Sequence, residues 1–323
     1  MRRIAAIALA CVLSIMLGRL SPAFGSDAVA LISSLKGKVE VQRAHQKGLQ
    51  PAHLGEQLFE DDVVSTYDNS RASLFFSDGS VLTVYPKSRV TLSLREKDKK
   101  EGSSLVASLS KGVMEGIGGI FSVEKKRETL TAIPGIRKKI EEEEMGVRVM
   151  HPRNSVILTA RPHFRWRTNG KTGSFMVSLT LKGMRGRLWT LNTKEMAIPY
   201  PKDQRPLERG QTYFVRVESM DDSSVSDEVY FRILDDRGAE EVIRITKQME
   251  ELQKSNSDDG TPEFILATFY RNKGLYHMAL ERLDTLEKKN PVERFILEEK
   301  REIFAKIGFW KKWEEVNQKL NAR

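Results

Sequence analysis

Residues 29–109 alternate between hydrophobic and polar positions in short runs, which is the pattern of half-buried β-strands. Asp78 and Gly79 stand between two of the runs, and a tight hairpin turn needs the positive φ that glycine adopts freely. The pattern predicts an all-β module, built as a sandwich or a rolled sheet, with a hairpin at these two residues. Its strands are expected at 38–42, 70–76, 80–85, 89–94 and 105–110.

A second region of alternating residues extends from 147 to 235. Phe164 and Trp166 are two positions apart, so an extended strand places both rings on one face. We therefore expect a β-sandwich with these two aromatic side chains in its core. Further strands are predicted at 175–181, 186–191, 211–217 and 228–233.

The hydrophobic period changes to that of a helix after residue 238. Five residues define the apolar face of a first helix, namely Val242, Ile243, Ile245, Met249 and Leu252. Pro262 marks the first turn of the next helix. The expected fold class is therefore multidomain, with two β modules followed by an α-helical tail. The stretch 136–146 between the β modules combines basic and acidic residues and is predicted to be a charged helix or solvated linker.

The N-terminus has the features of a secretory signal peptide. Arg2 and Arg3 precede 14 apolar residues, a stretch too short to cross a bilayer as a helix, and small residues then lead to an expected cleavage site between Gly25 and Ser26. The sequence thus predicts a periplasmic or secreted protein. Two alternatives remain open, an uncleaved membrane anchor and a lipoprotein acylated at Cys11.

Composition narrows the possible partners and site types. The 323 residues carry a formal charge of +9, and signal cleavage removes three arginines and no acidic residue, which leaves +6. The basic runs are short and interrupted, so we expect solvated surface, with weak attraction to anionic cell-wall polymer or lipid headgroups as the alternative. Nucleic acid is not expected as a partner, because an exported protein rarely meets it. The one cysteine, Cys11, lies in the signal segment, which excludes a disulfide scaffold and a zinc finger in the mature chain.

The first β module resembles the FecR domain family. The matching elements appear in order: Gly37-Lys38-Val39-Glu40-Val41, then Gly55, Leu58, Asp62 and Thr66, then Ser70-Arg71-Ala72, Leu74, Phe76 and Asp78-Gly79-Ser80. Asp61 departs from the family, which has glycine there. The resemblance implies a fold and an extracytoplasmic compartment. The name-giving members relay a signal to a cytoplasmic sigma factor, and we do not expect that role here because only three residues precede the apolar run.

The second module resembles fibronectin type III and immunoglobulin-like sandwiches of bacterial extracellular proteins. The similarity rests on Pro162-x-Phe164-x-Trp166 and on Leu207-x-x-Gly210-x-x-Tyr213. Trp166 and Trp189 are candidates for sugar binding, although core packing for Trp166 and partial burial for Trp189 are the expected roles.

The helical tail resembles a tetratricopeptide repeat over the 34 residues from Gly260. Leu286, Lys300 and Arg301 depart from the repeat pattern. The matching positions are Leu266, Ala267, Tyr270, Gly274, Tyr276, Ala279, Leu283 and Pro291. The expected domains are a signal peptide at 1–25, a FecR-like domain at 26–135, a charged linker at 136–146, a fibronectin-III or immunoglobulin-like sandwich at 147–235 and a tetratricopeptide-like region at 238–323.

No constellation of residues points to catalysis, to a cofactor or to a metal. Five histidines are spread over the three modules without metal-ligand spacing, and the adjacent carboxylates lie in turn-like contexts. The glycine-rich stretch 116–120 lacks the Lys-Ser/Thr of a phosphate-binding loop. We expect no enzymatic activity.

The expected function is a non-enzymatic envelope adaptor that docks a protein partner through its helical tail. The candidate interaction residues are Tyr276, Phe309, Trp310 and Trp313. Two alternatives remain, a carbohydrate-binding module on peptidoglycan or exported polysaccharide, and a component of an envelope signal relay. The identity of the partner, the oligomeric state and the orientation of the modules do not follow from the sequence.

Overall fold

The computed structural model describes residues 28–92, 133, 135–144, 146–169, 173–221, 224–255, 258–291 and 293–322. The predicted signal peptide, the strand predicted at 105–110 and the glycine-rich stretch 116–120 lie outside these residues. The described chain has an all-β N-terminal part and a C-terminal region of helices, which confirms the predicted order of strands before helices.

Two four-stranded antiparallel sheets form the first β module. One has the order β4 (Gln57–Leu58), β1 (Ala30–Lys36), β6 (Arg71–Phe76) and β7 (Val81–Val84). The other has the order β3 (Gln50–Pro51), β2 (Val39–Gln42), β5 (Val63–Thr66) and β8 (Arg89–Thr91). Their facing side chains form a hydrophobic core that includes Ile32, Val41, Leu58, Val64 and Leu74.

The predicted hairpin at Asp78 and Gly79 is confirmed. β6 and β7 pair antiparallel, with Phe75 opposite Val81. Gly79 adopts a φ of 87°, and the Ser80 amide donates to Asp78 Oδ1 at 2.8 Å. Asp78 therefore forms the turn by an Asx-type hydrogen bond, as the sequence predicts.

A three-stranded and a five-stranded sheet form the second β module. The smaller sheet has the order β14 (Ala197–Pro199), β11 (His163–Thr168) and β9 (Val147–His151). The larger has the order β10 (Ser155–Ile157), β16 (Val229–Ile233), β15 (Thr212–Ser219), β12 (Phe175–Leu181) and β13 (Trp189–Thr193), in which β10 and β16 run parallel. Phe164 and Trp166 are buried between the sheets, as predicted from their spacing.

The segment between the β modules is not the solvated linker that was one of its two predicted forms. Residues Ile136–Glu144 form helix α3, which lies against the last helix of the chain. Glu143 of α3 is 4% exposed. One hydrogen bond and two ion pairs from other modules compensate the burial of this carboxylate, as described below.

Five helices form the C-terminal region: α4 (Asp236–Ser255), α5 (Thr261–Asn272), α6 (Tyr276–Lys289), α7 (Arg294–Ile307) and α8 (Trp310–Asn321). Val242, Ile245 and Met249 of α4 are buried, whereas Ile243 is 57% exposed and does not belong to the predicted apolar face. The small side chains of Ala267 and Ala279 are buried where α5 and α6 pack, and Pro291 lies exposed in the turn before α7. No described helix is long and apolar enough to span a membrane.

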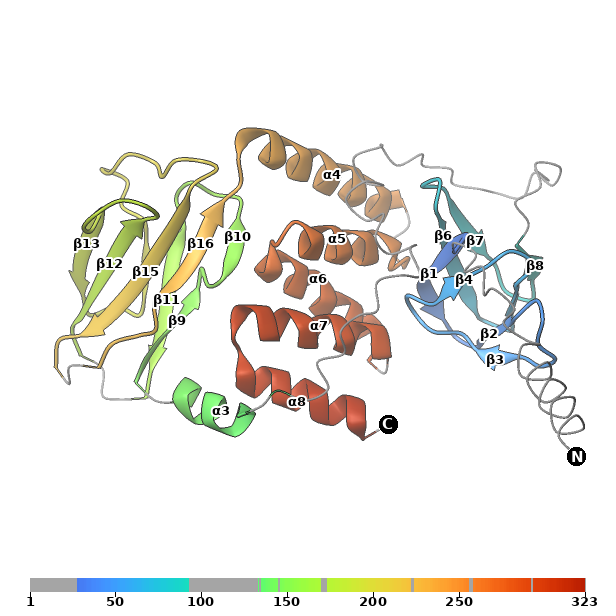
Figure 1. The fold of residues 1–323 in the computed structure, drawn as a ribbon. Coiled ribbons are helices and arrows are strands. Elements are labelled where there is room, and N and C mark those ends of the chain that lie inside the picture. The colour runs from blue at the N-terminus through green and yellow to red at the C-terminus, as the bar shows by residue number, and fades with distance from the viewer. Residues whose placement is uncertain are drawn as a thin grey trace, which may run out of the picture.

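The helices lie between the two β modules, although they follow both in the sequence (Figure 1). α5 contacts β1 of the first module, and α6 contacts β10 of the second. One hydrophobic core includes Leu31 and Phe75 of the first module together with residues of all five helices α4 to α8. The C-terminal region is thus the centre of the molecule.

Candidate functional site

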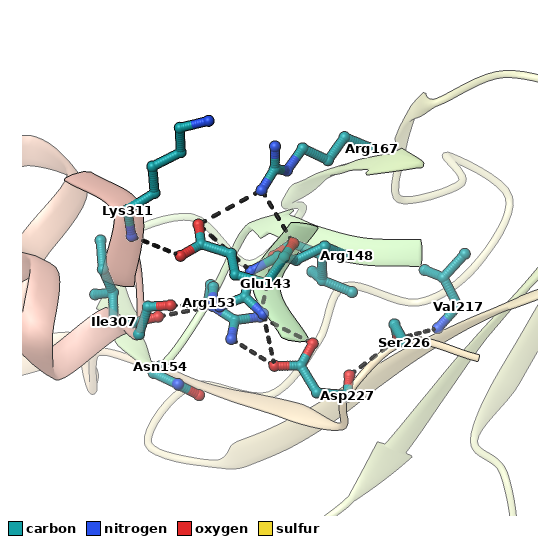
Figure 2. Close-up of polar contacts among 12 residues, drawn as sticks. Glu143, Arg148, Arg153, Asn154, Arg167, Val217, Ser226, Asp227, Ile307 and Lys311 are labelled. Carbon is teal, nitrogen blue, oxygen red and sulfur yellow. Dashed lines mark hydrogen bonds and ion pairs between the residues drawn. The ribbon is translucent and has the colours of Figure 1, made fainter. Parts of the chain in front are cut away.

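A cluster of charged side chains, of which Glu143, Arg148 and Arg153 are buried, joins the second β module to the helices (Figure 2). Strand alternation explains its origin, because Val147 and Val149 of β9 point into the sandwich and Arg148 between them points to the other side. Arg153 follows β9 at the same junction. The side chains of Arg148 and Arg153 are 9% and 4% exposed, so both cations are almost completely removed from water.

Both arginines bind the C-terminal end of α7. Arg153 Nε donates to the Ile307 carbonyl at 2.7 Å, and Arg148 Nη2 donates to the Gly308 carbonyl. The last carbonyls of a helix lack intrahelical donors and lie at the negative end of its dipole. Two cations from another module therefore cap this helix.

Two carboxylates pair with the three arginines of the cluster. Asp227 accepts hydrogen bonds from both terminal nitrogens of Arg153, in a bidentate pair. Glu143 lies 3.8 Å from Arg148 Nε and 3.5 Å from Arg167 Nη2. Burial lowers the pKa of Arg148, and the like charge of Arg153 lowers it further.

Glu143 also caps a helix. Its Oε2 accepts the backbone N–H of Lys311 at 2.9 Å, in the first turn of α8. A carboxylate at a helix N-terminus satisfies an unpaired donor and complements the positive end of the dipole. The junction therefore fixes the end of α7 and the start of α8 to the second β module and to α3.

The first β module caps the start of α5 in a similar way. The Gly260 amide donates to Ser34 Oγ at 3.0 Å, and Ser73 Oγ donates to Asp259 Oδ2 at 3.0 Å. Asp259 Oδ1 in turn accepts the Thr261 amide at 2.9 Å. Each β module thus supplies polar groups to a helix terminus of the C-terminal region.

The motif residues of the first module have structural roles. Gly37 adopts a φ of 72°, and a Cβ atom there would lie 2.5 Å from Ser70 Oγ. Thr66 donates to the Tyr85 carbonyl, and the Arg71 guanidinium lies 5.6 Å from the centre of the Tyr85 ring. Asp61 adopts a left-handed backbone conformation, with a φ of 66°.

Two of the four predicted interaction residues are buried, which corrects that prediction. Phe309 and Trp313 are 6% and 1% exposed and belong to the helical core. Trp310 is partly buried beneath Lys139 of α3, whose Nζ lies 4.4 Å from the ring centre, and Tyr276 is partly buried at the start of α6. The aromatic content of this segment predicted contact with a partner protein. Packing against α3 and the second module instead covers much of the surface of these rings.

Two histidines that are far apart in the sequence meet at the junction. The rings of His151 at the end of β9 and His277 in α6 have centroids 4.5 Å apart. His277 Nε2 is buried and has no hydrogen-bond partner among the described residues. Burial, with a smaller contribution from Arg165, lowers the pKa of His151 to about 4, and burial next to His151 lowers that of His277 to about 3. The pair was not predicted from the sequence, because the two histidines are far apart along the chain and come together only in the fold.

The outer face of the five-stranded sheet carries an aromatic pair, of which Tyr230 is exposed and Phe214 is half-buried. Phe214 lies directly opposite Tyr230, which is 45% exposed, and both point away from the sandwich core. Exposed Arg216 and Arg232 lie on the same face. By contrast, Trp166 is buried and Trp189 packs against Phe164 and Tyr200, so neither tryptophan offers an open ring for a sugar.

An open cleft of about 380 Å³ lies between the first module and the turn from α6 to α7. Lys36 and Lys38 line it, and each pairs with a carboxylate, Asp258 and Glu40 respectively. Across the described parts of the chain, no three histidine, cysteine or acidic side chains are grouped so that they could hold a metal ion.

Comparisons with known proteins do not assign a family. No family model matches this chain, and no curated protein matches it. Solved structures include a cell surface anchoring domain, 25% identical, which covers 21% of this chain and 88% of its own with a TM-score of 0.20. The FN1–FN3 domains of chicken CNTN1 are 7% identical and cover 65% of this chain and 64% of their own with a TM-score of 0.22.

Proposed function

We propose that this chain is a non-enzymatic adaptor of the cell envelope, exported by its N-terminal segment and built from a FecR-like domain, a fibronectin-like sandwich and a tetratricopeptide-like tail. The observation that carries the proposal is the pair of capped junctions, since residues of both β modules cap helix termini of the C-terminal region. Such junctions hold the surfaces of three modules at fixed spacing, which an adaptor requires.

The carboxylates at the junctions support a structural role rather than a catalytic one. Glu143, Asp227 and Asp259 each bind a helix terminus or an arginine, and these bonds occupy the oxygens that an acid–base mechanism would use. The helical tail remains the proposed docking element. Tyr276 and Trp310 are its anchors, because they keep exposed area that Phe309 and Trp313 lack.

The test is crosslinking and capture from intact cells with the full chain. Truncation at Asp236 is unsuitable because it would remove the helices that cover Leu31 and Phe75. We therefore test one variant that carries both Tyr276→Ala and Trp310→Ala. The control variant carries both Tyr85→Ala and Leu49→Ala. Tyr85 and Leu49 are exposed side chains of the first module, 44% and 45% accessible. If the chain is an adaptor, the unmodified chain and the control capture one envelope protein, and the variant with Tyr276→Ala and Trp310→Ala does not.

The aromatic pair on the outer sheet face favours glycan binding as a second candidate. Aromatic rings stack on sugar faces, and Arg216 and Arg232 would pair with acidic groups of peptidoglycan or of an acidic polysaccharide. Sedimentation with purified peptidoglycan compares Tyr230→Ala with Tyr85→Ala. Loss of binding in Tyr230→Ala alone supports the glycan function, and equal binding by both variants removes it.

A further inference from the structure

The hairpin between β12 and β13 forms an exposed tip at one end of the molecule. β13 is the edge strand on the side of its sheet opposite β10, and β10 is the strand that contacts the helices (Figure 1). Residues 182–188 of the hairpin are all exposed. A Cβ atom at Gly183 or Gly186 would meet no atom within 4 Å, so the tip extends free of the rest of the described chain.

The tip combines apolar and cationic side chains. Met184 and Leu188 are 50% and 40% exposed, so both hold apolar surface in water that would gain free energy by leaving it. Lys182 and Arg185 alternate with them and make no side-chain hydrogen bond or ion pair with any described residue. Arg187, the third cation, pairs with Glu218.

A neighbouring loop extends the positive surface. The Trp189 ring at the base of the hairpin packs 5.7 Å from the Tyr200 ring, which places the loop after Tyr200 beside the hairpin. This loop carries exposed Lys202 and Arg205, whose side chains likewise pair with no described residue.

We infer that this tip, defined as residues 182–188 with Lys202 and Arg205, binds the surface of a bilayer that contains anionic phospholipids. Met184 and Leu188 insert at the boundary between headgroups and acyl chains, and the cations contact lipid phosphates. The inference rests on the proposed envelope location, which brings the chain next to such a bilayer. Two apolar side chains on one hairpin are too few for a stable protein interface, which buries about 800 Å² on each partner.

The test measures binding of the form that begins at Ser26, which retains every described residue, to phosphatidylcholine vesicles with and without phosphatidylglycerol. The tip variant combines Met184→Ser and Arg185→Glu. The matched control combines Leu49→Ser and Lys47→Glu, which change one exposed apolar residue and one exposed cation of the first module in the same way. Thermal unfolding of both variants verifies that the fold is retained.

We expect the unmodified chain and the control to bind phosphatidylglycerol vesicles, and the tip variant to bind about tenfold more weakly or worse. Equal binding by the tip variant and the control overturns the inference, as does an absence of binding by the unmodified chain. A variant with only Met184→Ser and Leu188→Ser removes the apolar side chains and keeps the cations, so it distinguishes insertion into lipid from purely ionic binding. If it binds vesicles as well as the unmodified chain, the tip is an ionic surface without insertion and the inference is wrong. Because no partner protein is present, the outcome does not depend on the capture experiment.

Discussion

At the scale of single residues, Arg153 donates four hydrogen bonds at the junction. Its guanidinium donates to the carbonyls of Ile307 and Val149 and to both oxygens of Asp227. Removing one partner of a buried charge network leaves the others without compensation, and that costs more than the network contributes as a whole.

We therefore predict that Arg153→Gln lowers the free energy of unfolding by about 3 kcal/mol, because the Asp227 carboxylate and the Ile307 carbonyl both lose the hydrogen bonds that Arg153 donates. Urea unfolding measures the change. Arg294→Gln is the control, since Arg294 is a 66% exposed side chain that pairs with Glu298 one turn along α7, and we expect about 0.5 kcal/mol or less. Equal effects of the two substitutions would contradict the role of Arg153.

The histidine pair makes stability depend on pH. An unfolded histidine titrates near 6.5, whereas the folded chain lowers the pKa of His151 to about 4 and of His277 to about 3. Above pH 6.5 both states are neutral and the full stability is present. As the pH falls from 6.5 toward 3, the unfolded state binds protons that the folded state does not, so stability is lost.

A chain with His277→Leu should lose less stability between pH 7 and pH 4.5 than the unmodified chain. The expected difference appears in thermal unfolding midpoints recorded across this interval. His45→Leu, at an exposed position, should keep the original pH dependence. If His277→Leu and the unmodified chain show the same slope, the buried pair does not control acid sensitivity.

At the scale of elements, the turn between α5 and α6 sets how the helices meet the second β module. Gly274 adopts a φ of 75°, and a Cβ atom there would lie 3.0 Å from Val156 Cγ2 of β10. The Val156 amide also donates to the Gly274 carbonyl at 2.9 Å. The turn must therefore have both an unusual backbone conformation and a minimal side chain.

Gly274→Ala should lower the free energy of unfolding by about 2 kcal/mol, from backbone strain and from the contact with Val156. Gly135→Ala is the matched control, because Gly135 has a φ of 69° with no atom within 4 Å, and it should show the smaller, backbone part alone. Adding Val156→Ala to Gly274→Ala should reduce the excess over the control if the contact is its cause. Urea unfolding measures all three variants.

Elements were predictable from the sequence wherever the information was local. Alternation and the Asp78-Gly79 turn located the hairpin of the first module, and two residues of spacing located the aromatic core at Phe164 and Trp166. Helical period located the C-terminal region. The prediction that Ile243 belongs to the buried face of α4 was wrong. The helical period identifies an apolar face, but it does not show which edge of that face other elements cover.

The junctions were not predictable, since each depends on residues that only the folded chain brings together. Arg148 and the Gly308 carbonyl are 160 positions apart, and nothing near Arg148 in the sequence distinguishes it from a solvated arginine. Lys300 looked unfavourable at a small or apolar repeat position. In the structure its ammonium pairs with Glu287 and Asp284 of the preceding helix, which compensates its burial.

At the scale of the whole molecule, the shared core predicts cooperative unfolding. Leu31 and Phe75 of the first module pack with the helices, so neither part keeps its full core without the other. All four tryptophans, Trp166, Trp189, Trp310 and Trp313, lie outside the first module. Tryptophan fluorescence therefore reports on the second module and the helices, whereas circular dichroism also reports on the strands of the first module.

We predict that urea transitions followed by tryptophan fluorescence and by far-ultraviolet circular dichroism coincide. Leu31→Ala, a core truncation in the first module, should shift both midpoints to lower urea together, with a loss of about 2–4 kcal/mol. A fluorescence midpoint that stays unchanged while the circular dichroism midpoint falls would show that the modules unfold independently.

The central position of the helices also sets the order in which the chain can mature. Both β modules leave the ribosome before the helices that complete their contacts, so Leu31 and Phe75 stay uncovered until these helices are synthesised. Chains that stop early, or that lose their C-terminal helices to cleavage, keep an apolar surface that chaperones and proteases recognise. The position of helices α4 to α8 thus makes their presence a condition for the survival of both β modules.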